Sequence, residues 1–309
     1  MDVRRAHAVV SCIARFTISG NKLVGGVPTA LGSLPNLQVV WLGSNDLTGT
    51  IPIGIFEATS LAVLDISTNH LTGEIPTEIG QLVNLTTLIT GQNNLTGHIP
   101  LELETMDQLV VLVLDGNEFT GVIPDFSASR FLAVLRVESS GKMDPQPFPG
   151  YLVNMTNLVE LRLNGCSLTG TIPSQIRHLA NLGILYLQDN SLTGEIPFMI
   201  ADITGLQELS LQNNTLTGSI PSELTSLAKL ETMSLANNNL TSTLPDNLGG
   251  MDSLITLSVG GNRFTGTIPP SLTAMLALEY LDFSNNALNG TIVSDIGSMT
   301  TLRKCGWFH

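Results

Sequence analysis

The sequence is poor in cysteine and in basic residues, and each shortage excludes a class of protein. The three cysteines, Cys12, Cys166 and Cys305, each stand more than a hundred residues apart. That spacing fits neither a disulfide framework nor a zinc site, so we expect no metal and no cofactor. Lysine and arginine together number 13 against 26 acidic residues, which gives a net charge of −13. Nucleic-acid binding requires a basic surface, so we expect no nucleic-acid partner.

Long apolar runs are also missing. No run approaches the ~20 residues that a membrane-spanning helix needs. The N-terminal stretch MDVRRAHAVVSC has two arginines and a weakly apolar segment interrupted by His7, which indicates neither a secretory signal nor a transit peptide. We expect no membrane contact within this chain, although an anchor could belong to a longer parent protein. The compartment stays open: the cell surface or exterior if the chain is a fragment of a receptor-like protein, the cytoplasm if it is complete.

One repeating unit dominates the chain: L-x-x-L-x-L-x-x-N-x-L-T-G-x-I-P followed by eight looser residues. Most units are 24 residues long, as from Leu37 to Leu61. About twelve complete units precede a thirteenth that begins at Leu302 and stops. Self-similarity at such a period is typical of solenoids, in which stacked units share one core. The units begin at Ile13, Leu37, Leu61, Leu85, Leu109, Leu132, Leu158, Leu182, Leu206, Leu230, Leu254 and Leu278.

Each part of the unit has a physical reason. The L-x-L segment has a period of two, which predicts a short strand with both leucines on one side. A buried amide needs partners, so the recurring asparagine predicts a ladder of hydrogen bonds to the backbone of adjacent coils. Cys166, a small residue suited to burial, replaces that asparagine in one unit. The glycine permits a tight bend and the proline starts a return segment, in which stretches such as SQIRHLAN predict short helical or 3₁₀ turns.

A threonine follows the motif leucine in most units. The β propensity of threonine at this position favours a strand in a second sheet. The alternative interpretation of these threonines is an ordered array that binds ice. The array consists of Thr48, Thr72, Thr96, Thr120, Thr169, Thr193, Thr217, Thr241 and Thr265.

The motif resembles that of the plant-type leucine-rich repeat family and is similar to its receptor-like ectodomains. The LTGxIP element marks this subclass, and the match extends over residues 13–302. The resemblance implies an α/β solenoid, a right-handed, twisted horseshoe or superhelix with a parallel concave β-sheet and a second short sheet near the LTG segment.

The ends depart from the family, whose secreted members usually have a cysteine pair before the first repeat. We expect an N-terminal flank over 1–12, a repeat domain over 13–301 with an irregular repeat at 132–157, and a truncated repeat or improvised cap over 302–309. Trp307 and Phe308 would form such a cap.

No catalytic constellation is present. The five histidines fall in different repeats, and no nucleophile elbow, phosphate loop or paired acid–base motif occurs, so we expect no enzyme and no catalytic residue. Asn-x-Ser/Thr sequons matter only if the protein is secreted, where they would accept N-glycans. They lie at Asn84, Asn94, Asn154, Asn213, Asn239 and Asn289.

Candidate ligand-binding residues are those that the repeat does not dictate, on the outward positions of each strand. Apolar residues on these positions predict an apolar strip toward the N-terminal end, made of Trp41, Ile89, Val113, Val110, Val39 and Val63. The outward positions also hold more carboxylates than arginines, which favours basic or polar partners. These carboxylates are Asp65, Asp115, Glu138, Glu160, Asp189, Glu208, Glu231, Glu279 and Asp282.

Two arginines, Arg136 and Arg162, occupy the same position in consecutive repeats, and Tyr186 follows them. Two interpretations stay open. In one, Glu138 and Glu160 compensate the arginines in a solvated charge lattice. In the other, the arginines hold a carboxylate or polar group of a ligand by bidentate bonds, with Tyr186 supplying contact area and Glu138, Glu160 and Asn164 around them. The R-x-R pair that some peptide-hormone receptors of the family use is absent, since R-V-E and R-L-N stand there instead.

The repeat breaks at residues 141–150, GKMDPQPFPG. The N-x-L-T-G turn is lost, but Phe148 and Pro149 still occupy the I-P position, so the frame recovers. Insertions in solenoids lie in loops, which are frequently functional, and neutral drift is equally compatible with this one.

The resemblance therefore implies non-catalytic recognition of a peptide, protein or glycan on the concave face, in signalling or defence. Two alternatives remain: an enzyme inhibitor like the polygalacturonase-inhibiting proteins, and an intracellular scaffold for protein–protein interaction.

Overall fold

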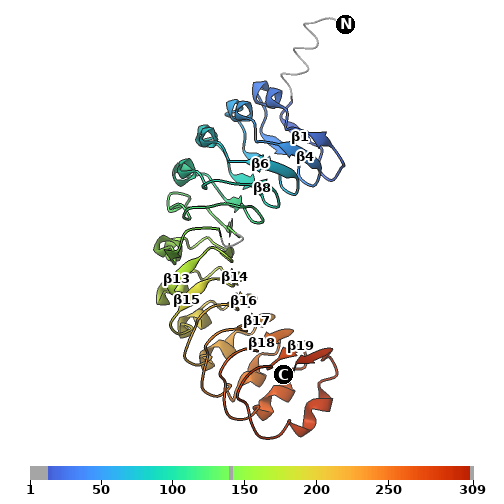
Figure 1. Ribbon diagram of the computed structural model, residues 1–309, viewed down its shortest axis with the longest axis vertical. Helices are drawn as coiled ribbons and strands as arrows, with labels where there is room; N and C mark the ends of the chain where they lie inside the picture. Colours follow the sequence, from blue (N-terminus) through green and yellow to red (C-terminus); the bar gives the residue numbers. More distant parts are fainter. Residues whose placement is uncertain (1–12, 139–141, 307–309) are drawn as a thin grey trace, which may run out of the picture. The chain divides into compact units, whose positions relative to one another are not determined.

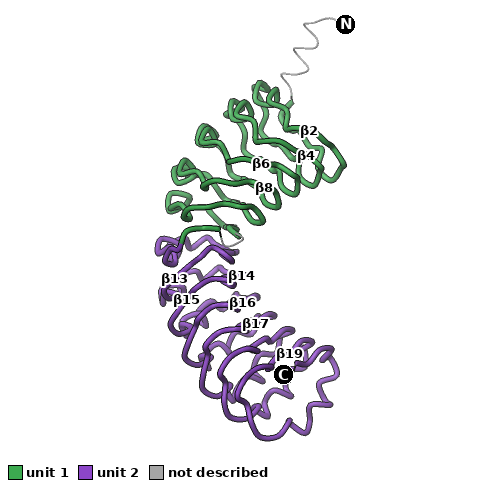
Figure 2. Tube along the Cα trace, viewed as in Figure 1, with its two compact units in different colours: residues 1–144 green, residues 145–309 purple. Residues whose placement is uncertain are grey.

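A computed structural model describes residues 13–138 and 142–306, which form two compact units, Met1–Asp144 and Pro145–His309 (Figure 2). The expected N-terminal flank and the cap formed by Trp307 and Phe308 lie outside the described residues, and the domain boundaries stay predictions. The division falls inside the irregular stretch GKMDPQPFPG.

Short parallel strands, one per repeat, form the main sheet of each unit (Figure 1). The register advances by one repeat per strand, as in the pair Val63↔Thr87. In the first unit the order is β1 (Arg15–Thr17), β3 (Val39–Trp41), β5 (Val63–Asp65), β7 (Thr87–Ile89), β9 (Val111–Val113) and β10 (Val134–Arg136). In the second it is β12 (Glu160–Arg162), β14 (Ile184–Tyr186), β16 (Glu208–Ser210), β17 (Thr232–Ser234), β18 (Thr256–Ser258), β19 (Tyr280–Asp282) and β20 (Lys304–Gly306).

A second, shorter sheet follows the main strands in each unit. It contains the LTG segments, so Thr48, Thr72 and Thr169 lie in strands, as their β propensity predicts. In the first unit it consists of β2 (Val24–Gly25), β4 (Asp46–Gly49), β6 (His70–Gly73) and β8 (Asn94–Leu95). In the second it consists of β11 (Gln146–Pro147), β13 (Leu168–Thr171) and β15 (Ser191–Thr193).

Short 3₁₀ helices return the chain on the opposite side of each coil, which confirms the expected turns. Proline precedes most of them, as Pro76 precedes η3 with φ −62°, because its fixed φ suits an extended N-cap. They are η1 (Thr29–Ser33), η2 (Ile53–Glu57), η3 (Thr77–Gln81), η4 (Leu101–Thr105), η5 (Gly150–Asn154), η6 (Ser174–His178), η7 (Phe198–Asp202), η8 (Ser222–Ser226), η9 (Leu248–Gly250), η10 (Pro270–Ala274) and η11 (Ser294–Ser298).

The leucines of each coil stack into a continuous core in each unit. Leu161, Leu185 and Leu209, the middle residues of neighbouring strands, are fully buried. Since side chains alternate along a strand, the residues on either side of each leucine face the opposite way, toward the concave surface.

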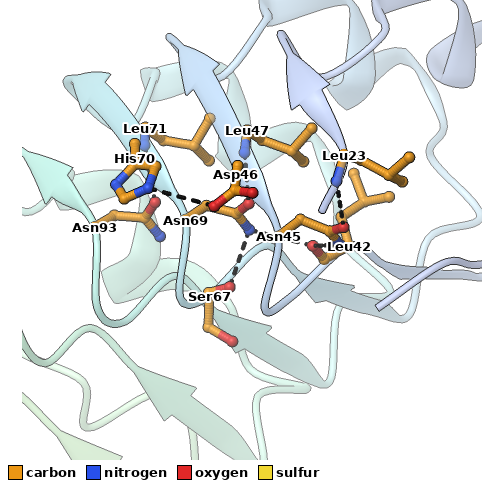
Figure 3. A network of polar contacts seen from close by, with 10 residues as sticks. All are labelled: Leu23, Leu42, Asn45, Asp46, Leu47, Ser67, Asn69, His70, Leu71 and Asn93. Carbon is orange, nitrogen blue, oxygen red and sulfur yellow. Dashed lines mark hydrogen bonds and ion pairs between the residues drawn. The ribbon is translucent and has the colours of Figure 1, made fainter. Parts of the chain in front are cut away.

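The motif asparagines form the predicted ladder (Figure 3). Asn69 donates through Nδ2 to the carbonyl of Leu42 at 3.2 Å and to that of Ile66 at 3.1 Å. Its Oδ1 accepts from the backbone N–H of Leu47 at 3.0 Å. Each asparagine thus joins its own coil to the preceding one and supplies hydrogen bonds to backbone groups of both coils. The same pattern holds at Asn45, Asn93 and Asn117 in the first unit and at Asn190, Asn214, Asn238, Asn262 and Asn286 in the second.

The residue before each ladder asparagine adopts a left-handed backbone. Gln92, Asp189 and Asn213 have φ between 55° and 59°, and glycine stands at the equivalent positions Gly116 and Gly165. Residues other than glycine rarely adopt this backbone conformation. The turn therefore imposes a local strain that the ladder bonds on both sides hold in place.

The irregular repeat rejoins the pattern where the sequence predicts. Pro149 precedes η5 and Phe148 is buried, as the I-P pair is elsewhere. Upstream, Lys142 forms an ion pair of 2.9 Å with Glu118, and Met143 bridges to Gly121. Glu118 and Gly121 stand at the repeat positions where earlier repeats have second-sheet strands, so Lys142 and Met143 contact that side of the coil.

Candidate functional site

Outward side chains of β12, β14 and β16 form a connected polar cluster in the second unit. Arg162 Nε donates to the carboxylate of Glu160 on the same strand. The guanidinium carbon of Arg162 lies 4.4 Å from the centroid of the Tyr186 ring. The Tyr186 hydroxyl in turn donates to Glu208. We call these four residues the Arg162 cluster.

Burial gives the cluster more rigidity than an exposed charge lattice has. Glu160 is only 8% exposed, and Arg162, Tyr186 and Glu208 are half-buried. A guanidinium stacked on an aromatic face and paired with a carboxylate has few other rotamers available. Compensation of Arg162 by Glu160, one of the two interpretations of the sequence, is therefore present, but in a partly desolvated setting.

The environment of Tyr186 raises the pKa of its hydroxyl to about 12. Burial is the largest cause, followed by the hydrogen bond to Glu208 and the negative charge of that carboxylate, while Arg162 opposes the shift. Tyr186 is therefore a neutral hydrogen-bond donor at physiological pH, and it holds Glu208 in place.

Arg162 keeps donors for a ligand. A guanidinium has five N–H donors, and Nε is the one that Glu160 accepts. A carboxylate or a carbonyl of a ligand could bind the terminal nitrogens without breaking that pair. The cluster thus offers an oriented cationic donor beside an aromatic ring, which is suited to recognition rather than to bond chemistry.

A column of amides borders the Arg162 cluster and went unnoticed in the sequence, apart from Asn164. Asn164, Gln188 and Gln212 occupy the seventh position of three consecutive repeats. Their side-chain oxygens are buried and have no hydrogen-bond partner among the described residues. We call these three residues the amide column. Its signal in the sequence is the run of three amides where the other repeats have glycine, serine or alanine or, at Asp115 and Glu138, a carboxylate.

Arg136 and Glu138 belong to the first unit, whereas the Arg162 cluster belongs to the second. Arg136 ends β10 and is half-buried, and Glu138 follows it two residues later. Their participation in one site with Arg162 and Tyr186 stays a prediction.

The apolar strip of the first unit is narrower than the sequence predicts. Trp41 is 39% exposed and Ile89 is half-buried, but Val113 is 9% exposed and belongs with the core. Trp41 is paired in register with Asp65 on the next strand, so a polar residue interrupts the strip. Use of the strip as a ligand surface stays a prediction.

The sequons lie mainly at exposed positions. Asn84, Asn94, Asn154, Asn213 and Asn289 are exposed and Asn239 is half-buried. Two of the amides are occupied: Asn84 donates to the Thr59 carbonyl at 3.0 Å and Asn213 to Asp189 at 2.6 Å. Glycosylation at any of the six stays a prediction.

The described residues contain neither a candidate metal site nor a candidate membrane-spanning helix. Within residues 13–138 and 142–306, no three histidine, cysteine or acidic side chains gather as they would around a metal ion. Nor does any helix in those two ranges have the length and hydropathy that a bilayer crossing requires.

Comparison with known proteins identifies the fold and its relatives. Leucine-rich repeat family models match residues 204–264 and, as single repeats, residues 60–82, 157–179 and 277–299. A comparison with curated protein sequences finds no match.

Several solved structures are similar over nearly the whole chain. The plant peptide hormone receptor RGFR1 in complex with RGF2 is 27% identical with a TM-score of 0.81, covering 98% of this chain and 60% of that one. The Arabidopsis receptor kinase HAESA, in complex with the peptide hormone IDA and the co-receptor SERK1, is 28% identical with a TM-score of 0.81, covering 94% and 53%. The chain thus spans little more than half of these receptors.

A bacterial protein is similar over more of its own length. A leucine-rich repeat protein of Leptospira interrogans is 33% identical with a TM-score of 0.73, and the match covers 94% of this chain and 71% of that protein. Together with the repeat motif, the ladder and the parallel strands, these matches show that the chain belongs to the leucine-rich repeat family.

Proposed function

We propose that the protein is a non-catalytic recognition module that binds a peptide or protein ligand on the concave face of its second unit, in signalling or defence. The observation that supports this most is the Arg162 cluster. Arg162 lies 4.4 Å from the Tyr186 ring, and both are anchored by carboxylates, so the donor and the aromatic surface are positioned before any ligand arrives.

Similarity to peptide-hormone receptors favours a peptide over other ligands. RGFR1 and HAESA are described in complex with RGF2 and with IDA. The cluster has the features of a binding hot spot, in which arginine and tyrosine predominate. Glycan recognition is the alternative function, and a binding screen that contains both peptides and oligosaccharides distinguishes the two.

The test compares two arginine variants of the full chain on an array of peptides and oligosaccharides. Arg162→Ala removes the stacked donor of the cluster. Arg177→Ala is the matched control, because Arg177 is also paired with a carboxylate, Asp202 at 3.2 Å, but lies on η6 at the opposite side of the coil. Thermal melting of both variants is followed in parallel.

We expect wild-type peptide hits to weaken at least about tenfold in Arg162→Ala and to persist in Arg177→Ala, at similar melting temperatures. Hits confined to oligosaccharides would change the ligand class. Hits that are equal in both variants would contradict binding at the cluster.

A further inference from the structure

The side-chain oxygens of the amide column are buried without a hydrogen-bond donor in the described part of the chain, which is unusual in a folded protein. Buried side-chain oxygens nearly always have a hydrogen-bond donor. Asn164 is only 6% exposed, and its Oδ1 has none among the described residues. The Oε1 atoms of Gln188 and Gln212 are in the same state. An unpaired buried acceptor destabilises the folded protein, so three in adjacent coils call for an explanation.

Backbone hydrogen bonds fix the three residues side by side. Gly165 N–H donates to the Gln188 carbonyl at 3.1 Å, and Asp189 N–H donates to the Gln212 carbonyl at 3.0 Å. Adjacent coils are therefore joined at the column itself. Neighbouring amides are then about 4.8 Å apart, the spacing of paired strands.

The surroundings of the column are acidic. Glu208, which accepts the Tyr186 hydroxyl bond, precedes Gln212 by four residues in the same coil. Asp189 directly follows Gln188, and its carboxylate accepts from the Asn213 amide at 2.6 Å. Arg162, two residues before Asn164, is already paired with Glu160. A row of acceptors bordered by carboxylates favours a partner that has several donors, no acceptor and a positive charge.

We propose that the amide column binds the guanidinium of an arginine side chain in a peptide ligand. A guanidinium has five donors in one plane, so it can reach oxygens of two adjacent amides, whereas an ammonium is a compact point charge. Gln188 and Gln212 are half-exposed residues, and their terminal torsions are soft, so a small rotation turns each oxygen toward the ligand. This inference rests on the proposed function for its peptide context.

The first experiment uses the full chain and a defined probe. N-acetyl-arginine amide is titrated while the side-chain amide signals of Asn164, Gln188 and Gln212 are followed by nuclear magnetic resonance. The matched probe is N-acetyl-citrulline amide, which keeps N–H donors but has no charge. We expect saturable shifts of the three amides with the arginine probe and binding at least about tenfold weaker with citrulline. The absence of saturable shifts, or equal binding of the two probes, would overturn the inference.

Two substitutions at one position give effects of opposite sign. Gln212→Met removes the unpaired oxygen at nearly constant volume, so we expect an equal or higher melting temperature together with weaker binding of the arginine probe. Gln212→Glu adds a carboxylate and is expected to strengthen that binding. Gln175→Met, an exposed residue on η6, is the control that leaves binding unchanged. Unchanged binding in both Gln212 variants would show a merely structural column.

The outcomes separate this inference from the proposed function. Amide shifts with the arginine probe, but no peptide hits on the array, would contradict the proposed function and support the arginine site. Peptide hits that depend on Arg162, without any response of the three amides, would contradict the arginine site alone.

Discussion

Replacement of Asn69 by alanine tests the ladder, because that one side chain joins two coils. Nδ2 donates to the carbonyls of Leu42, Ile66 and Ser67 at 3.0–3.2 Å, and Oδ1 accepts from the Leu47 N–H at 3.0 Å. Alanine leaves the buried Leu47 N–H without its partner (Figure 3), which costs about 1–3 kcal/mol. The two buried carbonyls lose further bonds of about 1 kcal/mol each. We expect a total loss of about 3–5 kcal/mol.

Asn21 supplies the matched control at the same repeat position. It is exposed, and its Nδ2 donates to carbonyls of Ile18 and Ser19 in its own coil. Water can replace those bonds, so Asn21→Ala is expected to destabilise the protein by less than about 1 kcal/mol.

Both variants are measured by urea unfolding of the full chain, with amide hydrogen exchange at Leu47 as a local readout. Local exchange matters because stability in a repeat array is not uniform. In Asn69→Ala the Leu47 amide should exchange much faster than in the wild type. Equal losses of stability in the two variants, or an unchanged exchange rate at Leu47, would refute the account of the ladder.

Three further predictions concern single side chains. Thr90 is fully buried, and its hydroxyl has no hydrogen-bond partner among the described residues. Thr90→Val is therefore expected to raise the free energy of unfolding, measured by urea titration, by about 1 kcal/mol. A decrease in that free energy would contradict the prediction. The pKa of Tyr186 is raised from 10.0 to about 12, so the folded state gains stability from this group below pH 10.0 and loses it as the pH rises through about 12. Tyr186→Phe should abolish this pH dependence of the free energy of unfolding, together with the phenolate absorbance that develops near pH 12. An unchanged titration in the variant would contradict the prediction. Burial and, to a lesser extent, the Asp282 carboxylate raise the pKa of Cys305 to about 11. Alkylation of its thiol near neutral pH should therefore be at least about tenfold slower in the folded chain than in the urea-unfolded chain. Peptide mass spectrometry measures the two rates, and equal rates would contradict the prediction.

The repeated elements were predictable because each is specified many times. The alternation of leucines predicted strands such as Glu160–Arg162, and the recurring proline predicted the 3₁₀ returns. The asparagine ladder followed from the need to pair a buried amide. Even in the irregular repeat, the I-P position predicted where η5 begins at Gly150.

The features that escaped prediction depend on individual neighbours rather than on the repeat. The left-handed backbone at Asp189 and Gln92 follows from the turn geometry, since neither residue type requires it. The burial of Val113 depends on the side chains packed around it. The side-chain oxygens of Gln188 and Gln212 are unpaired because no hydrogen-bond donor of the described residues lies within reach. Sequence spacing placed Arg162 near Tyr186, but the anchoring of Tyr186 by Glu208 required the structure.

Hydrogen exchange of the full chain, with and without a peptide ligand selected on the array, tests the central claim most directly. Ligand binding on the concave face of the second unit predicts protection in the segments that contain β12, β14 and β16, while the segments of η6, η7 and η8 exchange as before. Protection confined to the 3₁₀ segments, with unchanged exchange in those strands, would contradict the claim.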